Sequence, residues 1–179
     1  MALLFQSNPD QWDLRGSIEP GEKVSWFVTR YLNFMRPGVL TLLWEAQGSK
    51  APGVRGLYGW GVTLGEAMPD RQGRLRIPLQ YVERWIAKSD ADENVSDIEH
   101  IAAVPAQDIL LLSSWQDHLL ATMPIGTNFI VTPSQILELS ESIVRPRFPD
   151  SEFPRAARMD SEGVPLVVEN FSKQRLVEV

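Results

Sequence analysis

The chain has 179 residues and a mass of 20.2 kDa, which fits one domain with or without an appendage. It contains 17 Lys and Arg against 23 Asp and Glu, no Cys, and only two His residues, His100 and His118. Disulfides, thiol catalysis and thiolate metal sites are therefore excluded, and a His-rich metal site has too few ligands. We expect no metal and no cofactor.

Short strands are predicted along the first half of the chain. Apolar alternation, with β-branched and aromatic residues, marks segments 2–6, 23–28, 39–45, 54–64 and 75–82. Pro-Gly and Gln-Gly turns separate the first four, and this spacing is typical of a small barrel or sandwich. Pro78 predicts an edge strand or a bulge. The glycines at 53–65 indicate close strand contacts, because no helix follows them to form a dinucleotide loop.

Helices are predicted from their start signals. Asn8-Pro9-Asp10 predicts an N-cap for a turn that Gly16 ends, and Thr29 predicts a cap for a short helix through Met35. Thr132 to Gln135 forms a capping-box pattern that predicts the helix continuing to residue 144. The segment 105–112 is equally compatible with a helix and a buried strand.

The last part of the chain changes in composition. From Arg145 onward prolines are frequent and apolar periodicity is weak, so we predict a domain over 1–144 followed by a Pro-rich linker and tail over 145–179. Within it, residues 145 to about 163 are expected to form either a linker or a tail that lies against the domain surface. The N-terminus lacks a basic region and no apolar run is long enough to span a membrane, so we expect a cytoplasmic protein.

Charge differs between the two halves. Residues 1–88 carry 11 basic and 8 acidic side chains, whereas residues 89–179 carry 6 and 15. Two interpretations stay open: the second half merely carries a solvated acidic face, or an anionic partner binds the first half.

Aromatic residues are the most informative chemical group. Six Trp are present, and core packing accounts for several of them. Trp26, however, lies close in sequence to Arg30 and Tyr31, and aromatic faces beside cationic and small polar groups suit a planar base. Ser113, Asp117 and His118 show no nucleophile motif, so catalysis is not expected.

Several motifs resemble the EVE domain, over residues 2–144. They are Leu3–Pro9, Trp26, Arg30-Tyr31, Met35–Gly38, Leu40–Trp44 and Gly126–Thr132. The resemblance implies an α+β fold, a β-dominated PUA-like open barrel with short flanking helices, related to the YTH readers of methylated adenine. It also implies that the protein binds modified bases in DNA or RNA.

The resemblance also implies a set of binding residues. Ser7 and Asn8 match the YTH residues that hydrogen-bond the base, and Trp26 matches an aromatic wall of the pocket. Trp44 lies at the end of the strand that faces the pocket in the family pattern. The loop at 66–74 has no aromatic residue for a second wall, so Tyr31, Trp44 or Trp60 would have to supply it. Thr127 and Asn128 belong to a segment near the pocket mouth. The expected phosphate-binding residues are Arg30, Arg36, Lys50, Arg55, Arg71, Arg74 and Arg76.

The expected function is thus non-catalytic recognition of a modified base, with a modified cytosine or another hypermodified base in DNA as the first choice. The expected partners are modified DNA or RNA, and a nuclease or other effector of a restriction or defence system. Two alternatives stay open: a PUA-like RNA-binding module, and a protein-interaction module whose tail binds an effector.

Overall fold

The structure, a computed structural model, describes residues 1–46, 55–85, 103–118 and 128–154. Its strands are β1 (Ala2–Ser7), β2 (Lys23–Phe27), β3 (Leu40–Glu45), β4 (Gly56–Thr63), β5 (Met68–Pro69), β6 (Leu75–Arg84), β7 (Val104–Pro105) and β8 (Asn128–Val131). Its helical segments are α1 (Leu14–Ser17), η1 (Leu32–Phe34), α3 (Ala106–Leu110), η2 (Ser113–Trp115), α5 (Pro133–Leu139), the π-helix η3 (Ser140–Val144) and α6 (Arg145–Arg147).

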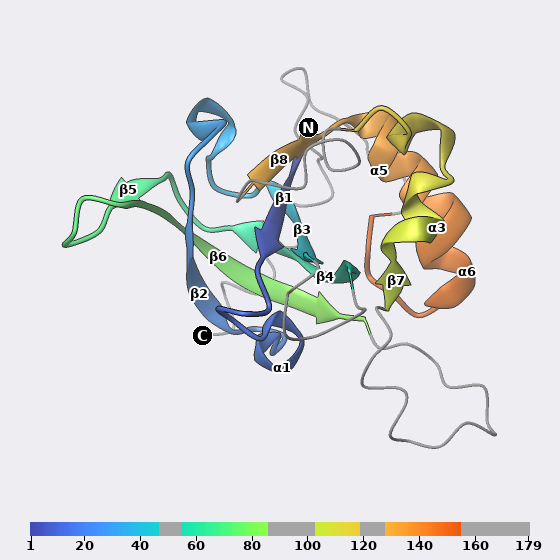
Figure 1. The fold of residues 1–179 in the computed structure, drawn as a ribbon, viewed down its shortest axis with the longest axis horizontal. Coiled ribbons are helices and arrows are strands. Elements are labelled where there is room, and N and C mark those ends of the chain that lie inside the picture. Colours follow the sequence, from blue (N-terminus) through green and yellow to red (C-terminus); the bar gives the residue numbers. More distant parts are fainter. Residues whose placement is uncertain (47–54, 86–102, 119–127, 155–179) are drawn as a thin grey trace.

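One curled sheet forms the centre of the molecule. The strand order is β2-β6-β4-β3-β1-β8, with β5 paired to β6 and β7 paired to β4. The β1–β3 pair is parallel and the other pairs are antiparallel. The sheet bends into an open barrel, with α3, α5 and α6 gathered on one side (Figure 1). The predicted α+β, β-dominated open barrel with short helices is confirmed.

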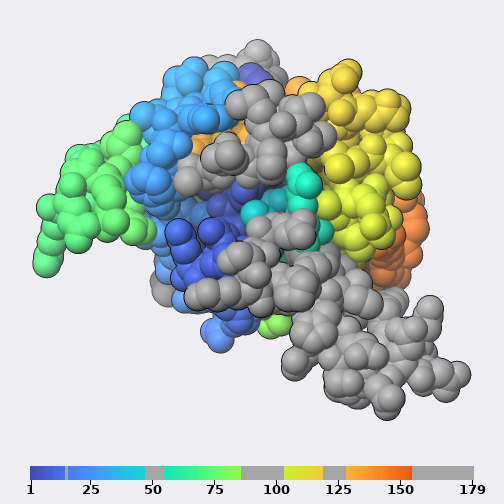
Figure 2. Space-filling view, in the orientation of Figure 1, coloured from blue at the N-terminus to red at the C-terminus, as the bar shows by residue number. Residues whose placement is uncertain are grey.

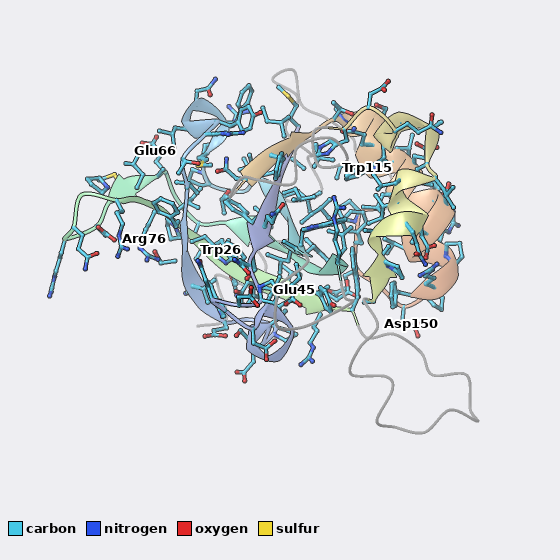
Figure 3. All side chains as sticks on the ribbon, in the orientation of Figure 1. Trp26, Glu45, Glu66, Arg76, Trp115 and Asp150 are labelled. Carbon is cyan, nitrogen blue, oxygen red and sulfur yellow. The ribbon has the colours of Figure 1, made fainter. Side chains whose placement is uncertain are left out.

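Strand alternation divides the buried side chains between the two faces of this sheet. Leu4 and Trp44 belong to a core that includes residues of α3 and α5, whereas Phe5 and Trp26 belong to a second core with α1. Trp26 therefore lies within the curl of the sheet, and Trp115 lies on the helical side (Figure 3). Successive side chains of a strand point to opposite faces, so register decides which residues share a site.

Pro78 does not lie on an edge strand, because β6 has neighbours on both sides. The register shift of the β4–β6 pair falls at Val82 and not at Pro78, so the prediction of an edge strand or a bulge is wrong at this residue. At Pro78 itself only β2 is paired, since β5 pairs with Leu75 and Arg76 and the β4 pairing begins at Leu79. The missing N–H thus falls where no ladder bond is required.

The strand glycines have a steric role, as expected. A Cβ on Gly59 would lie 2.2 Å from the carbonyl oxygen of Glu83, and one on Gly61 would lie 2.4 Å from that of Gln80. The close approach of β4 and β6 therefore requires glycine at both positions.

Helix starts follow the predictions only in part. The capping box is confirmed: Thr132 accepts from the backbone N–H of Gln135, whose side chain accepts from the N–H of Thr132. The helix expected from Asn8 is wrong in its start, because α1 begins at Leu14 and Asp13 caps it. Segment 105–112 combines both of its predicted states, with β7 ending at Pro105 and α3 following directly.

The chain passes residue 144 without a break and stays on the domain. Phe148 stacks on Trp85 at 5.6 Å, and Phe153 packs edge-on against both Trp60 and Trp85. The carboxylate of Glu83 accepts hydrogen bonds from the indole of Trp60 and, at 2.7 Å, from the hydroxyl of Ser151. Residues 145–154 therefore do not form the expected linker, and the rest of the predicted tail, 155–179, lies outside the described residues.

Candidate functional site

Three aromatic rings meet inside the curl of the sheet. Trp26, on β2, has its ring centroid 5.5 Å from that of Phe5 on β1 and 5.2 Å from that of Trp12. Its indole N–H donates to the hydroxyl of Tyr81 at 3.3 Å. Burial raises the pKa of Tyr81 to about 12, so this hydroxyl stays protonated near neutral pH. We call Phe5, Trp12 and Trp26, with the adjoining Ser7 and Asn8, the aromatic site.

A tight turn after β1 brings Trp12 to this place. The carbonyl of Asn8 accepts from the backbone N–H groups of Gln11 and Trp12, and the side-chain oxygen of Asn8 accepts from the N–H of Asp10. The hydroxyl of Ser7 donates to the carbonyl of Trp12 at 3.1 Å. Asn8 thus forms a turn of the kind in which an Asn side chain bonds to the backbone two residues further on, which competes with the helix predicted to start there.

The polar side chains around the rings differ in exposure. Ser7 is buried, whereas Asn8 is exposed and its Nδ2 makes no hydrogen bond to another described residue. The β1–β3 register places Glu45 opposite Ser7, on the same face of the sheet, with the side chain buried. Figure 3 shows Glu45 at the end of β3 and Trp26 on β2. An exposed amide, that of Asn8, thus follows Ser7 in the chain, and a buried carboxylate, that of Glu45, lies opposite Ser7 on the same face of the sheet.

Asn128 lies on this face, but its side-chain amide is hydrogen-bonded at both ends to the backbone of another segment. It pairs with Phe5 in the β1–β8 ladder and is fully buried. Its Nδ2 donates to the carbonyl of Arg30 at 2.6 Å, and its Oδ1 accepts from the N–H of Thr29 at 3.3 Å. The expectation that Asn128 binds a base is not supported by this geometry, since these bonds join β8 to the segment after β2. Thr127 lies outside the described residues.

Tyr31 directly follows Thr29 and Arg30, the two residues bonded to Asn128, and has a backbone conformation that few non-glycine residues adopt. Its φ is 59°, in the left-handed region, and it rather than Thr29 precedes the short helix η1. The helix cap predicted at Thr29 is therefore wrong. The half-buried Tyr31 ring packs against the core that contains Trp26, so it is compatible with a wall at the margin of the site.

Trp44 does not face this site, contrary to the prediction. It belongs to the core on the opposite face of the sheet and has no exposed surface. The guanidinium of Arg55 lies over its ring at 5.6 Å, and burial lowers the pKa of Arg55. Arg55, predicted to bind phosphate, thus lies over Trp44 on the face of the sheet opposite Trp26.

The other predicted phosphate-binding residues fall into two groups. Arg71, Arg74 and Arg76 belong to the β5–β6 hairpin, which protrudes from the barrel (Figure 2). The side chain of Asp70 accepts from those of Arg74 at 3.3 Å and Arg76 at 3.1 Å. The backbone N–H of Arg74, then that of Gln72 and the side chain of Arg76, lower the pKa of Asp70 to about 2. Arg30 and Arg36 lie on the segment between β2 and β3, next to the hairpin, and Lys50 lies outside the described residues.

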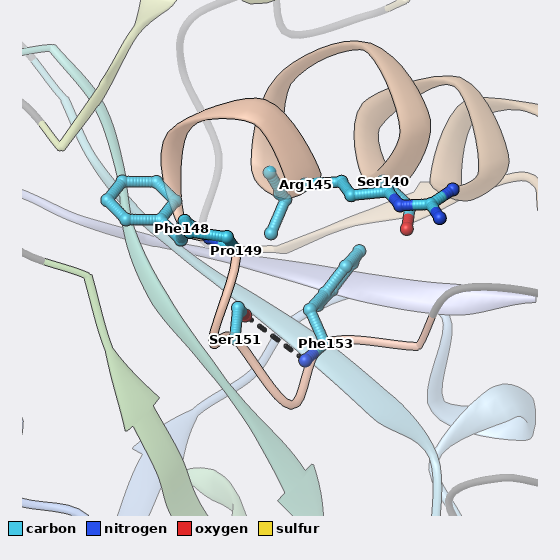
Figure 4. Close-up of a pocket in the computed structure, with 7 residues that line it drawn as sticks. Ser140, Arg145, Phe148, Pro149, Ser151 and Phe153 are labelled. Atoms are coloured by element: carbon cyan, nitrogen blue, oxygen red, sulfur yellow. Dashed lines mark hydrogen bonds between the residues drawn. The ribbon is translucent and has the colours of Figure 1, made fainter.

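A second place among the described residues is a small cavity under the C-terminal helical segments. A cavity of about 10 Å³, enough for one water molecule, lies between η3 and the segment 148–153 (Figure 4). Ser113 and Ser114 donate to Glu138, and the His118 ring contacts the carbonyl of Ile130, so these groups form no catalytic triad. No cluster of three metal-binding side chains occurs among the residues described. No helix in this part of the chain is long and apolar enough to cross a membrane.

Comparison with known proteins gives structural similarity only. No protein-family model and no curated protein matches the sequence. A crystal structure from Pseudomonas syringae is 18% identical, with a TM-score of 0.52 over 83% of this chain and 100% of its own. An NMR structure from Rhodopseudomonas palustris is 14% identical, with a TM-score of 0.53 over 75% and 86%. A hypothetical protein from Leishmania major is 15% identical, with a TM-score of 0.52 over 83% and 95%. These similarities show a shared fold.

Sequence patterns alone missed Trp12, which belongs to the aromatic site, and Glu45, which lies opposite Ser7. Trp12 was part of the aromatic count without a role, because its place over Trp26 depends on the turn after β1. Glu45 was hidden because only the parallel β1–β3 register puts it opposite Ser7. An acidic residue at the end of an otherwise apolar strand was the one available signal.

Proposed function

We propose that the protein binds a modified nucleobase of DNA at the aromatic site without chemical conversion of the base. The observation that carries this proposal is the meeting of Trp26, Trp12 and Phe5 beside Ser7 and Asn8, at the stretch that resembles the EVE domain. Stacking on an aromatic side chain contributes about 1–3 kcal/mol per base, which makes the face of the Trp26 ring a suitable base-binding surface.

The polar groups support a base with an exocyclic amino group. Carboxylates accept hydrogen bonds from N4 of cytosine, and Asn side chains pair with base edges. Glu45 is an acid on the same face as Ser7, and the Nδ2 of Asn8 is an exposed donor. A modified cytosine therefore fits the chemistry of the aromatic site and is the first ligand to test.

Phosphate contacts would come from the side of the barrel nearest this site. Arg30 is exposed and makes no ion pair with another described residue, and the hairpin presents Arg71 at its tip. The chain as a whole has a net charge of -6, so we expect weak and salt-sensitive binding of unmodified duplex. Selectivity would then depend on the base rather than on the backbone.

The test compares one substitution on the two faces of the sheet. Trp26→Leu and Trp44→Leu both remove a buried indole, but only the first removes a ring of the aromatic site. We expect Trp26→Leu to weaken binding of a modified oligonucleotide about 10-fold or more, whereas Trp44→Leu retains it. Circular dichroism of both variants checks that each is folded, and Asn8→Ala adds an exposed variant with an expected loss of about 5-fold.

The ligand panel separates the remaining functions. Single-stranded DNA and RNA oligonucleotides that each carry one modified base are titrated beside unmodified controls, with tryptophan fluorescence as the signal. Preference for one modified DNA supports the proposal. Stronger binding of the matched RNA would identify RNA rather than DNA as the ligand. Equal responses across the panel would contradict base recognition and favour a protein-interaction module.

A further inference from the structure

Trp12 separates Trp26 from solvent. The Trp12 side chain belongs to a turn rather than to a strand or helix, and 37% of its surface is exposed. Trp26 beneath it retains only 4% exposure. One face of Trp26 is therefore covered by a residue that itself lies at the protein surface.

The two indoles are too close to admit a base between them. Carbon atoms of rings in contact lie about 3.5 Å apart, so two rings that enclose a base are about 7 Å apart. The Trp12 and Trp26 centroids are separated by 5.2 Å, with 31° between the planes. A base can stack on this face of Trp26 only where the indole of Trp12 now lies.

Few interactions hold Trp12 in this place. Its indole N–H donates to the hydroxyl of Ser17 at 2.7 Å, and this hydroxyl donates in turn to the carbonyl of Asp13. Both side-chain contacts are exposed, and an exposed hydrogen bond contributes little net stability. The backbone of the turn is held separately, by the bonds to Asn8 and Ser7. The side chain can therefore rotate away while the turn keeps its shape.

We propose that Trp12 is a displaceable lid, and that the volume of its indole is the subsite for the ring of a planar base stacked on Trp26. This inference rests on the proposed function. The lid excludes water from Trp26 in the free protein, and it raises selectivity because only a base with enough contacts to offset the loss of the Trp12–Trp26 packing can enter.

Binding measurements with Trp12→Ala test the lid directly. Because the variant has no indole to displace, we expect it to bind the best oligonucleotide of the panel about 5- to 10-fold more tightly and to discriminate less between modified and unmodified bases. Ser17→Ala, which removes only the anchor of the indole, is expected to tighten binding about 2-fold. Gln11→Ala, an exposed neighbour in the same turn, is the control and should bind as the unaltered protein does.

Fluorine NMR of protein labelled with 5-fluorotryptophan supplies a second readout, with the Trp12 signal assigned from its loss in Trp12→Phe. Saturating oligonucleotide should shift this signal toward the position of an exposed indole. Equal or weaker binding by Trp12→Ala, or a Trp12 signal that ligand leaves in place, overturns the lid but leaves base recognition standing. Absence of binding by both proteins across the panel overturns the proposed function, and the lid with it.

Discussion

The side chain of Asn128 donates to the main-chain carbonyl of Arg30 over 2.6 Å, across 98 residues of sequence. The strand path begins at β2 and ends at β8, and the described pairings include no ladder between these two strands. The same amide accepts from the N–H of Thr29, so one buried side chain joins the two edges of the open barrel.

Replacement of Asn128 should therefore loosen the barrel. Asn128→Asp exchanges the donor for an acceptor that faces the Arg30 carbonyl, and a buried polar group without a partner costs about 1–3 kcal/mol. We expect the free energy of unfolding in urea to fall by at least this amount. Asn33→Asp, at an exposed position of η1, is the matched control and should change it by less than about 0.5 kcal/mol. Equal effects of the two variants would show that the hydrogen bonds of Asn128 contribute nothing to the free energy of unfolding.

The lowered pKa of Glu138 predicts that the folded protein loses stability in acid. Its two oxygens accept from the backbone N–H and hydroxyl groups of Ser113 and Ser114, which lower its pKa from 4.5 to about 2. A lowered pKa in the folded state means that the contribution is complete above about pH 4.5 and is lost as the pH falls toward 2. The difference in unfolding free energy between the protein and Glu138→Gln should shrink over this interval.

Asp117→Asn is the control for this pH experiment, because Asp117 is an exposed carboxylate that makes no hydrogen bond to another described residue. Chemical denaturation at pH 7, 5, 4 and 3 gives the required series. A Glu138→Gln difference that stays constant from pH 7 to 3 would contradict the role of the two serines.

The burial of Phe153 indicates that the segment after residue 147 is part of the domain. It is buried, and it packs against both Trp60 and Trp85. Phe153→Ala should lower the free energy of unfolding by about 3–5 kcal/mol, as expected for loss of a core aromatic ring. Leu137→Ala, at an exposed position of α5, should have a much smaller effect in the same denaturation assay. A small loss for Phe153→Ala would restore the linker interpretation.

The close approach of β4 and β6 at Gly59 leaves no room for a side chain at this position. A methyl group there would meet the Glu83 carbonyl at 2.2 Å, and backbone shifts of this kind cost about 1–3 kcal/mol. Gly65→Ala is a milder comparison, because its methyl group would lie 3.2 Å from the ring of the exposed Pro78. Thermal unfolding should show a clearly lower midpoint for Gly59→Ala than for Gly65→Ala, and the reverse order would contradict the close approach.

Sequence patterns were sufficient where the cause is local. Apolar alternation and the enrichment in β-branched and aromatic residues predicted β1, β2, β3, β4 and β6. Both signals are local, because they reflect which faces of a single strand are buried. The capping box of Thr132 and Gln135 was predictable because both partners lie within one turn of helix. Asn8 failed as a helix start for an equally local reason: its side chain bonds to Asp10, and Asp13 provides the cap instead.

The site depended on relationships that local patterns do not contain. Trp26 and Trp44 are both strand tryptophans, yet pairing and curl put them on opposite faces of the sheet. Asn128 was predicted from its motif as a base-binding residue, but the approach of β8 to the end of β2 uses both ends of its amide. The positions of Trp12 and Glu45 likewise follow from a turn and a parallel register.

The sequence by itself thus determined the five longer strands of the first half, the capped helix at Thr132, the β-dominated class and the residue types suited to a planar ligand. Only the tertiary structure decided which of those residues lie together, because a strand's periodicity indicates that its side chains alternate between two faces without indicating which face meets which neighbour. Contacts such as Trp12 with Trp26 and Asn128 with Arg30 arise when the sheet curls and its edges approach.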